Sequence, residues 1–125
     1  MHLAAACTLC LAACAAAGQL EVSVVDAEGK AMPCRVHLTV DGKPVYAEGL
    51  PRYERDGHFA CLGSFAVEAP AGTAKLLIER GPEYEPFIAE EQIGNDGATR
   101  VQAKLRRWID MNERGWYSGD LHVHR

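Results

Sequence analysis

Alternation of apolar and polar side chains in short segments is the feature that most constrains the fold of this chain. In residues 20–24, Leu20, Val22 and Val24 alternate with polar residues, and the same period of two recurs in 36–40. Successive side chains of a β-strand point to opposite faces, so this pattern indicates strands with one buried face. Turn-forming sequences rich in Gly, Asn, Asp and Pro separate the segments. The pattern predicts an all-β chain.

The number and spacing of these segments favour a β-sandwich. About seven strands in roughly 90 residues, with regular turn signals, are typical of an immunoglobulin-like or prealbumin-like sandwich, and no convincing helix is expected. The segments expected to form strands are 20–24, 36–40, 44–47, 59–61, 65–68, 75–79, 87–93 and 99–107. A chain of 125 residues fits one such domain.

Several charged and aromatic groups are interpreted as parts of this sandwich. The last strand places basic residues on one face, as a solvated outer face requires. A set of glutamates lacks the Asp, Asn and Gly spacing of a calcium loop and is interpreted as surface charge. His37 and His58, in strand and turn positions, are interpreted as structural or surface residues, and Tyr84 and Trp116 as packing residues. The residues that share this face of the last strand are Arg100, Gln102, Lys104 and Arg106, and the glutamates are Glu83, Glu85, Glu90 and Glu91.

The first 18 residues differ in composition from the rest, being rich in Ala, Leu and Cys with no charged side chain. They are interpreted as an export signal, which predicts a periplasmic, extracellular or membrane-anchored protein. Two forms of processing remain open. Signal-peptide cleavage after Ala17 fits the small residues 15–17, whereas Leu-Ala-Ala-Cys at 11–14 resembles a bacterial lipobox and would lipidate Cys14. An Ala-rich helix packed on the domain is the alternative without export.

Charge and hydropathy argue against a nucleic-acid partner and against a membrane-spanning helix. The chain has 13 Lys and Arg against 17 Asp and Glu, a net charge of −4, with no dense basic block. A nucleic-acid partner is therefore not expected. The longest apolar run, residues 3–17, is shorter than the roughly 20 residues that a membrane-spanning helix needs. No transmembrane span is expected.

Two cysteines lie in the body of the chain, Cys34 and Cys61, while the other three lie in the first 18 residues. An exported protein meets an oxidising environment, where these two can form a disulfide. Two buried thiols that pack as small apolar side chains are the alternative. The sequence leaves both open.

The C-terminal segment carries the strongest functional signal. On a strand, Asp120, His122 and His124 share one face, while Leu121 and Val123 share the other. Two imidazoles at this spacing can bind one divalent metal, and a carboxylate beside them can bind the metal or orient a ligand histidine. A His-x-His pair alone arises often by chance, so the surrounding sequence decides its weight.

That surrounding sequence, GWYSGDLHVH at 115–124, resembles the opening of the PHP-type (polymerase and histidinol phosphatase) metallohydrolase domain of the CehA/McbA-like family. Upstream, PAGTAKL at 70–76 and IERGPEYEP at 78–86 are similar to segments of the carboxypeptidase regulatory-like or transthyretin-like sandwich that precedes that domain in such proteins. The resemblance implies a signal in 1–18, a β-sandwich in 19–107, and a linker with the first PHP strand in 108–125.

The resemblance also implies a chemistry. His122 and His124 would be ligands of a multi-metal site, with Asp120 as a ligand or orienting group, and Zn, Mn or Fe would activate water for hydrolysis. The remaining ligands of a PHP site come from later strands of a barrel, a catalytic domain in cis that this chain lacks. The chain alone is therefore expected to be inactive and to bind no metal tightly.

Two hypotheses about function follow from these predictions. The first is the N-terminal part of an exported metal-dependent hydrolase, in which the sandwich supports a neighbouring catalytic domain. The second is a stand-alone secreted or lipid-anchored β-sandwich that binds peptide, carbohydrate or another protein. Whether the chain belongs to an enzyme depends on which of the two holds.

Overall fold

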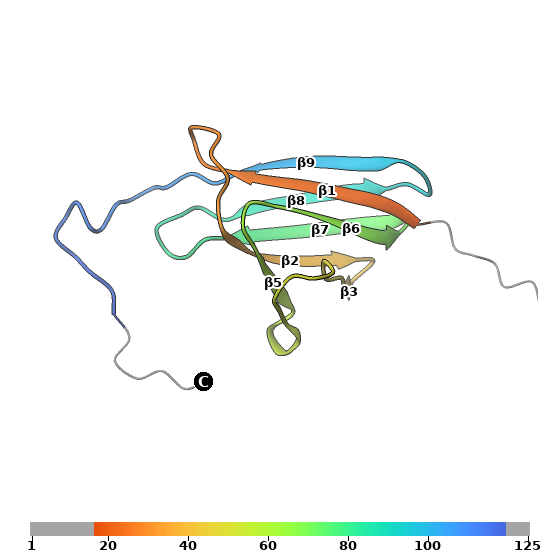
Figure 1. Ribbon diagram of the computed structural model, residues 1–125, viewed down its shortest axis with the longest axis horizontal. Helices are drawn as coiled ribbons and strands as arrows, with labels where there is room; N and C mark the ends of the chain where they lie inside the picture. The colour runs from red at the N-terminus through yellow and green to blue at the C-terminus, as the bar shows by residue number, and fades with distance from the viewer. Residues whose placement is uncertain (1–16, 120–125) are drawn as a thin grey trace, which may run out of the picture.

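Two β-sheets face one another in the computed structural model, which describes residues 17–119 (Figure 1). This confirms the all-β sandwich. One 3-10 turn, η1 (Glu54–Asp56), is the one helical element of residues 17–119. The strands are β1 (Ala17–Val25), β2 (Cys34–Val40), β3 (Lys43–Pro44), β4 (Arg52–Tyr53), β5 (His58–Cys61), β6 (Ser64–Pro70), β7 (Gly72–Glu79), β8 (Phe87–Ile93) and β9 (Ala98–Lys104).

The smaller sheet has three strands in the order β6-β1-β9. The central strand β1 runs antiparallel to β6 and parallel to β9. Register pairs Val22 with Phe65 on one side and with Val101 on the other. Paired residues point to the same face, and all three side chains are buried. The alternation in the sequence is thus the alternation between the core face and the outer face of this sheet.

The larger sheet has six strands in the order β4-β5-β2-β7-β8, and β3 also pairs with β2. Strand β2 lies in its middle, where Val36 is the register partner of Phe59 in β5 and of Ile78 in β7. All three side chains are fully buried. The outer face of the same strands carries polar residues, including Arg35 and His37 of β2.

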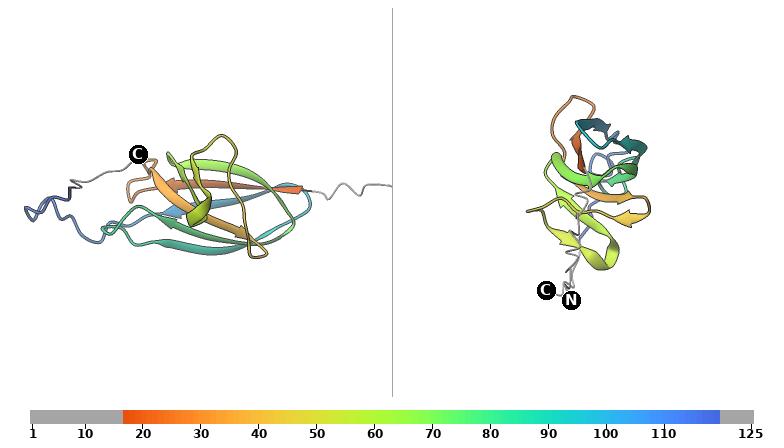
Figure 2. Two further views of the ribbon diagram at one scale, coloured as in Figure 1. Left: turned by 90° about the horizontal axis from the view of Figure 1, so that it is seen from below. Right: turned by 90° about the vertical axis from the view of Figure 1, so that its right-hand side faces the viewer.

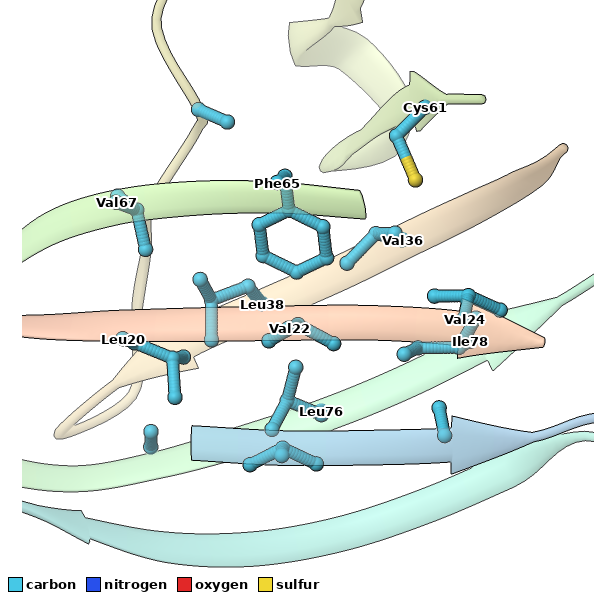
Figure 3. Packing of buried hydrophobic residues seen from close by; sticks show 14 of the residues in the cluster. Leu20, Val22, Val24, Val36, Leu38, Cys61, Phe65, Val67, Leu76 and Ile78 are labelled. Carbon is cyan, nitrogen blue, oxygen red and sulfur yellow. The ribbon is translucent and has the colours of Figure 1, made fainter. Parts of the chain in front are cut away.

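The core lies between the two sheets (Figure 3). Branched aliphatic side chains of β1, β2 and β7 supply a large part of it, because such side chains pack well on a pleated surface. The Phe59 and Phe65 rings meet edge to face at 5.0 Å between centroids and connect the two sheets. The largest fully buried side chains are Phe59, Leu20, Leu38, Leu76, Ile78, Leu105, Val24 and Val36.

Two expected strands are shorter in the structure. The segment expected at 44–47 contributes only Lys43–Pro44 to the sheet, and the chain then packs its apolar side chains on the core, with Ala47 buried. The strand expected at 99–107 ends at Lys104, because Arg106 and Arg107 turn toward carboxylates of the β7–β8 loop. Strand β4 has only two residues and was not expected.

The described chain enters and leaves the sandwich at opposite ends (Figure 2). Ala17 begins β1, and because β9 runs parallel to β1, Lys104 at the end of β9 pairs with Val25 at the end of β1. Residues 105–119 therefore continue from the end of the sandwich that is far from Ala17. Within residues 17–119, no helix has the length and apolar character needed to cross a membrane.

Candidate functional site

The predicted metal motif lies outside the described residues. Asp120, His122 and His124 follow Gly119, the last described position, and Cys14 precedes the first one. Within residues 17–119, no group of three or more His, Cys, Asp or Glu side chains lies close enough to hold a metal ion. The metal and lipidation sites therefore stay predictions.

The structure brings Cys34 and Cys61 together. They are register partners in the β2–β5 pair, both are buried, and their Sγ atoms lie 3.3 Å apart as two thiols that share a hydrogen bond. A sulfur–sulfur bond needs about 2.05 Å, so a small rotation of the side chains separates this pair from a disulfide. The disulfide stays a prediction, and the positions of the two cysteines permit it.

The shared hydrogen bond separates the pKa values of the two thiols. Donation from Cys34 stabilises a thiolate at Cys61 and lowers the pKa of Cys61 from 9.0 to about 6, against the opposing effect of burial. The same hydrogen bond and burial raise the pKa of Cys34. The first proton of the pair therefore leaves more readily than the second, as expected for two acidic groups in contact.

One carboxylate ties the segment after β9 to the sandwich. The Oε2 atom of Glu83 accepts a hydrogen bond from Nε of Arg107 at 3.0 Å, and its Oε1 atom accepts one from the backbone N–H of Met111 at 3.2 Å. Arg107 also pairs with Asp110. The interpretation of Glu83 as a surface charge is therefore incomplete, because this side chain fixes the path of the chain toward the predicted metal motif.

Aromatic side chains line a groove of about 660 Å³ on the same segment. The indole N–H of Trp108 donates to the carbonyl of Pro82 at 2.8 Å, which holds the ring in place. Trp108 is 56% exposed, Trp116 66% and Tyr117 82%. We call this surface, formed by Trp108, Trp116 and Tyr117 with Met111, the aromatic groove. Trp116 is therefore not the packing residue that the sequence suggested.

A larger hollow, of about 970 Å³, lies between the outer face of the six-stranded sheet and the β7–β8 loop. Arg35, Arg80 and His58 line it, together with Tyr53 and Tyr84. We call it the arginine hollow. It shares Arg80, Tyr84 and Glu83 with the aromatic groove, so both lie around the loop at the end of the sandwich where the chain leaves.

Sequence reasoning missed the surroundings of His58. This residue was expected in a turn, but it begins β5 and is only 8% exposed. Its ring stacks on Tyr53 at 4.8 Å and lies 5.3 Å from the His37 ring, whose Nε2 is 3.3 Å from Glu79. The only signal for this cluster was the position of His37 on the polar face of its strand, which cannot reveal partners in other strands.

Comparison with known proteins identifies the fold. No protein-family model matches the chain, and no curated protein matches it. Solved structures with a similar fold include the Bacillus anthracis TIE protein, which has 8% sequence identity and a TM-score of 0.52, over 74% of this chain and 17% of that chain. They also include GBS52, the minor pilin of Streptococcus agalactiae, which has 15% sequence identity and a TM-score of 0.57, over 76% of this chain and 46% of that chain. The chain spans less than half the length of either protein. At these identities the likeness shows the fold alone, a β-sandwich domain.

Proposed function

We propose that this chain is the N-terminal part of an exported metal-dependent hydrolase. It comprises an accessory β-sandwich and the first metal-ligand motif of a PHP-type catalytic domain that follows. The observation that carries the proposal is the sequence GWYSGDLHVH at 115–124, placed directly after a sandwich domain. Neither the solved structures nor the described residues bear on this chemistry, so the motif alone supports it.

The residues of the motif suit the proposed metal. Imidazole nitrogen and carboxylate oxygen are ligands that Zn, Mn and Fe accept. His122 and His124 would bind the metal, which supplies activation of water when it is bound, and Asp120 would bind it or orient one of the histidines. Within residues 17–119, no three or more His, Cys, Asp or Glu side chains form a group that could hold a metal ion, and under this proposal the following domain supplies the remaining ligands. This chain on its own would be inactive.

The path of residues 105–119 suits a connection between two domains. Leu105 is the last buried residue of the sandwich, and the hydrogen bonds of Glu83 then hold residues as far as Met111 against the β7–β8 loop. A segment held in this way limits the directions in which a following domain can lie. Export rests on the composition of residues 1–18, and the similarity to a minor pilin is compatible with it.

Reading the coding sequence beyond Arg125 tests the proposal. We expect an open frame with further His, Asp and Glu motifs, and a stop codon directly after Arg125 would overturn it. In the longer protein, His122→Gln and His124→Gln should each lower the metal content measured by elemental analysis. His37→Gln is the matched control, because His37 lies on the outer face of the sandwich, and it should leave the metal content unchanged.

A second function, a stand-alone secreted or lipid-anchored binding module, is favoured by one observation. The end of the sandwich carries two adjacent concave surfaces, the arginine hollow and the aromatic groove, and concave surfaces of this size are typical binding sites. A stop codon after Arg125 would leave this function as the better one. An open frame with metal motifs would favour the hydrolase.

A further inference from the structure

We propose that the aromatic groove is the surface on which the following catalytic domain packs. The inference rests on the proposed function, because its partner is the domain expected after Arg125 in the same protein. Three features of the described residues support it: a group of exposed aromatic side chains, a connecting segment held in one conformation, and the position of the groove directly before the predicted metal motif.

The groove gathers large side chains that water does not favour. Among residues 17–119, six large apolar or aromatic side chains are exposed, and three of them, Trp108, Trp116 and Tyr117, line this groove. The other three are spread over β4, β8 and the turn between β5 and β6. Trp and Tyr are enriched in the centres of protein interfaces, where each removes a large apolar area from water. The groove therefore has the composition of one side of an interface.

The segment that carries these aromatic residues is held in one conformation although it is exposed. Oδ1 of Asp110 accepts hydrogen bonds from the backbone N–H groups of Asn112 and Glu113. The backbone N–H of Trp116 donates to the carbonyl of Met111 at 2.9 Å, which closes the turn. Figure 1 shows this turn beyond the end of the two sheets. Glycine-rich and serine-rich connections between domains are flexible, whereas specific contacts fix this one.

The wall of the groove next to the sandwich is fixed as well. The indole N–H of Trp108 donates to the carbonyl of Pro82 at 2.8 Å. Arg107 pairs with Glu83, and its guanidinium lies 5.8 Å from the centre of the Tyr84 ring. Side chains that are already fixed lose little conformational entropy when a partner binds, so a preformed groove favours association.

The position of the groove in the chain selects its occupant. Ser118 lines the groove, and the predicted metal motif begins at Asp120, two positions later. A domain that starts there is tethered beside the groove, and a short tether gives an effective concentration on the order of millimolar. A second copy of the chain has to reach that concentration in solution. The tethered domain is therefore favoured over a free partner.

Docking at the groove explains how an accessory sandwich supports a catalytic domain. The first strand of that domain, with the proposed ligands His122 and His124, follows the groove directly. A metal site built from several strands works only when its ligands are held within narrow geometric limits. A domain packed on a fixed surface keeps its first strand in one place.

Oxidative labelling of side chains, read out by mass spectrometry, tests the docking. It compares the 125-residue chain with the longer protein encoded by the complete reading frame. In the longer protein, labelling of Trp108, Trp116 and Tyr117 should fall by roughly fivefold, because residues at the centre of an interface are shielded from water. Tyr46 is the internal reference, since it lines a small hollow with Gln19 at the opposite end of the sandwich, and its labelling should be equal in both proteins.

Variants of the longer protein identify the anchoring side chains. Trp116→Ala should return the labelling of Met111 and Trp108 to the rate in the 125-residue chain with the same substitution, because a few large side chains carry most of the binding energy of an interface. Ile88→Ala is the matched control, since it removes a side chain that is 74% exposed on β8 outside the groove, and protection should persist. Tyr117→Ala provides an independent variant if Trp116→Ala does not fold.

Two outcomes would overturn the docking alone. One is equal labelling of the groove in the 125-residue chain and in the longer protein. The other is protection that already appears in the 125-residue chain and grows with its concentration, which would assign the groove to a second copy. Neither outcome affects the hydrolase proposal, which the metal content of the longer protein tests. A stop codon directly after Arg125 would remove both proposals, so the two kinds of failure are distinguishable.

Discussion

At the scale of single residues, the pairing of Cys34 with Cys61 is the clearest case of a feature that the sequence suggests and only the structure can place. The two cysteines are 27 positions apart, and nothing in their spacing shows that β2 and β5 set them directly opposite each other. Their burial in the core also explains why both side chains are small and weakly polar. The choice between thiols and a disulfide then depends on the oxidising conditions that the protein meets.

We expect that the exported protein contains the disulfide. Denatured but unreduced protein should show no free thiol in a quantitative thiol assay, and reduction should then reveal two in the body of the chain. Closing a loop of this length should stabilise the fold by about 3 to 4 kcal/mol, because the unfolded chain loses conformational freedom. Detection of two thiols without reduction would rule the disulfide out.

The reduced chain should have a distinctive dependence of stability on pH. The Cys61 thiol ionises near pH 6 in the folded chain, with its pKa lowered from 9.0. Between pH 6 and pH 9 the unfolded chain binds more protons than the folded chain, so the free energy of unfolding should rise with pH over this range. As the pH falls back through 6, this added stability is lost. Above pH 9 the raised pKa of Cys34 reverses the trend, because only the unfolded chain then releases that proton.

Urea unfolding in a reducing buffer measures this effect. The Cys61→Ala variant is the control, since it removes the shared hydrogen bond, and its profile should lack the additional rise between pH 6 and pH 9. Identical profiles for the two proteins would show that the thiols do not share a proton in the folded chain.

At the scale of secondary-structure elements, the sequence predicted the long strands well and the short ones poorly. Strands β1 and β2 alternate strictly because each has one face in the core, and this signal is local. Strands β3 and β4 have two residues each and exist only because a neighbouring strand offers hydrogen bonds. No local pattern can reveal them.

The candidate sites were predicted less well than the strands, for the same reason. Arg35 of β2, His58 of β5 and Arg80, which follows β7, line one hollow because strand register sets β2 between β5 and β7. Glu83 resembles its neighbouring glutamates in sequence, yet it alone binds both Arg107 and the backbone of Met111. The concave surfaces at this end of the sandwich are formed by contacts between residues distant in the sequence, which composition and periodicity do not reveal.

The role of Glu83 in holding the segment after β9 can be measured. In the Glu83→Ala variant, the backbone N–H of Met111 loses its acceptor, so its hydrogen exchange should become roughly tenfold faster. Glu85→Ala is the matched control, because the carboxylate of Glu85 binds the side chain of Arg106 and not Met111, and exchange at Met111 should not change. Unchanged exchange in both variants would mean that Glu83 does not hold the segment.

At the scale of the whole molecule, the sandwich contains a complete core that ends at Leu105. A chain that ends at Asp110 should therefore unfold cooperatively, with a Tm within about 4 °C of the full chain. A chain that ends at Lys104 also lacks the buried Leu105 and should lose about 2 to 5 kcal/mol of stability. Thermal unfolding followed by circular dichroism compares the three. An equal loss in both shortened chains would place part of the core beyond Asp110.

The opposite placement of the two ends of the sandwich has a consequence for a lipid-anchored form. Strand β1 has nine residues and spans about 30 Å, so the end of β9 lies roughly that far from Ala17, the first described residue. The electrostatic potential of a charged bilayer decays over about 8 Å at physiological ionic strength. If the end at Ala17 faces a bilayer, the far end of the sandwich would therefore lie in the ionic conditions of the surrounding solution, at a local pH that the lipid headgroups do not alter.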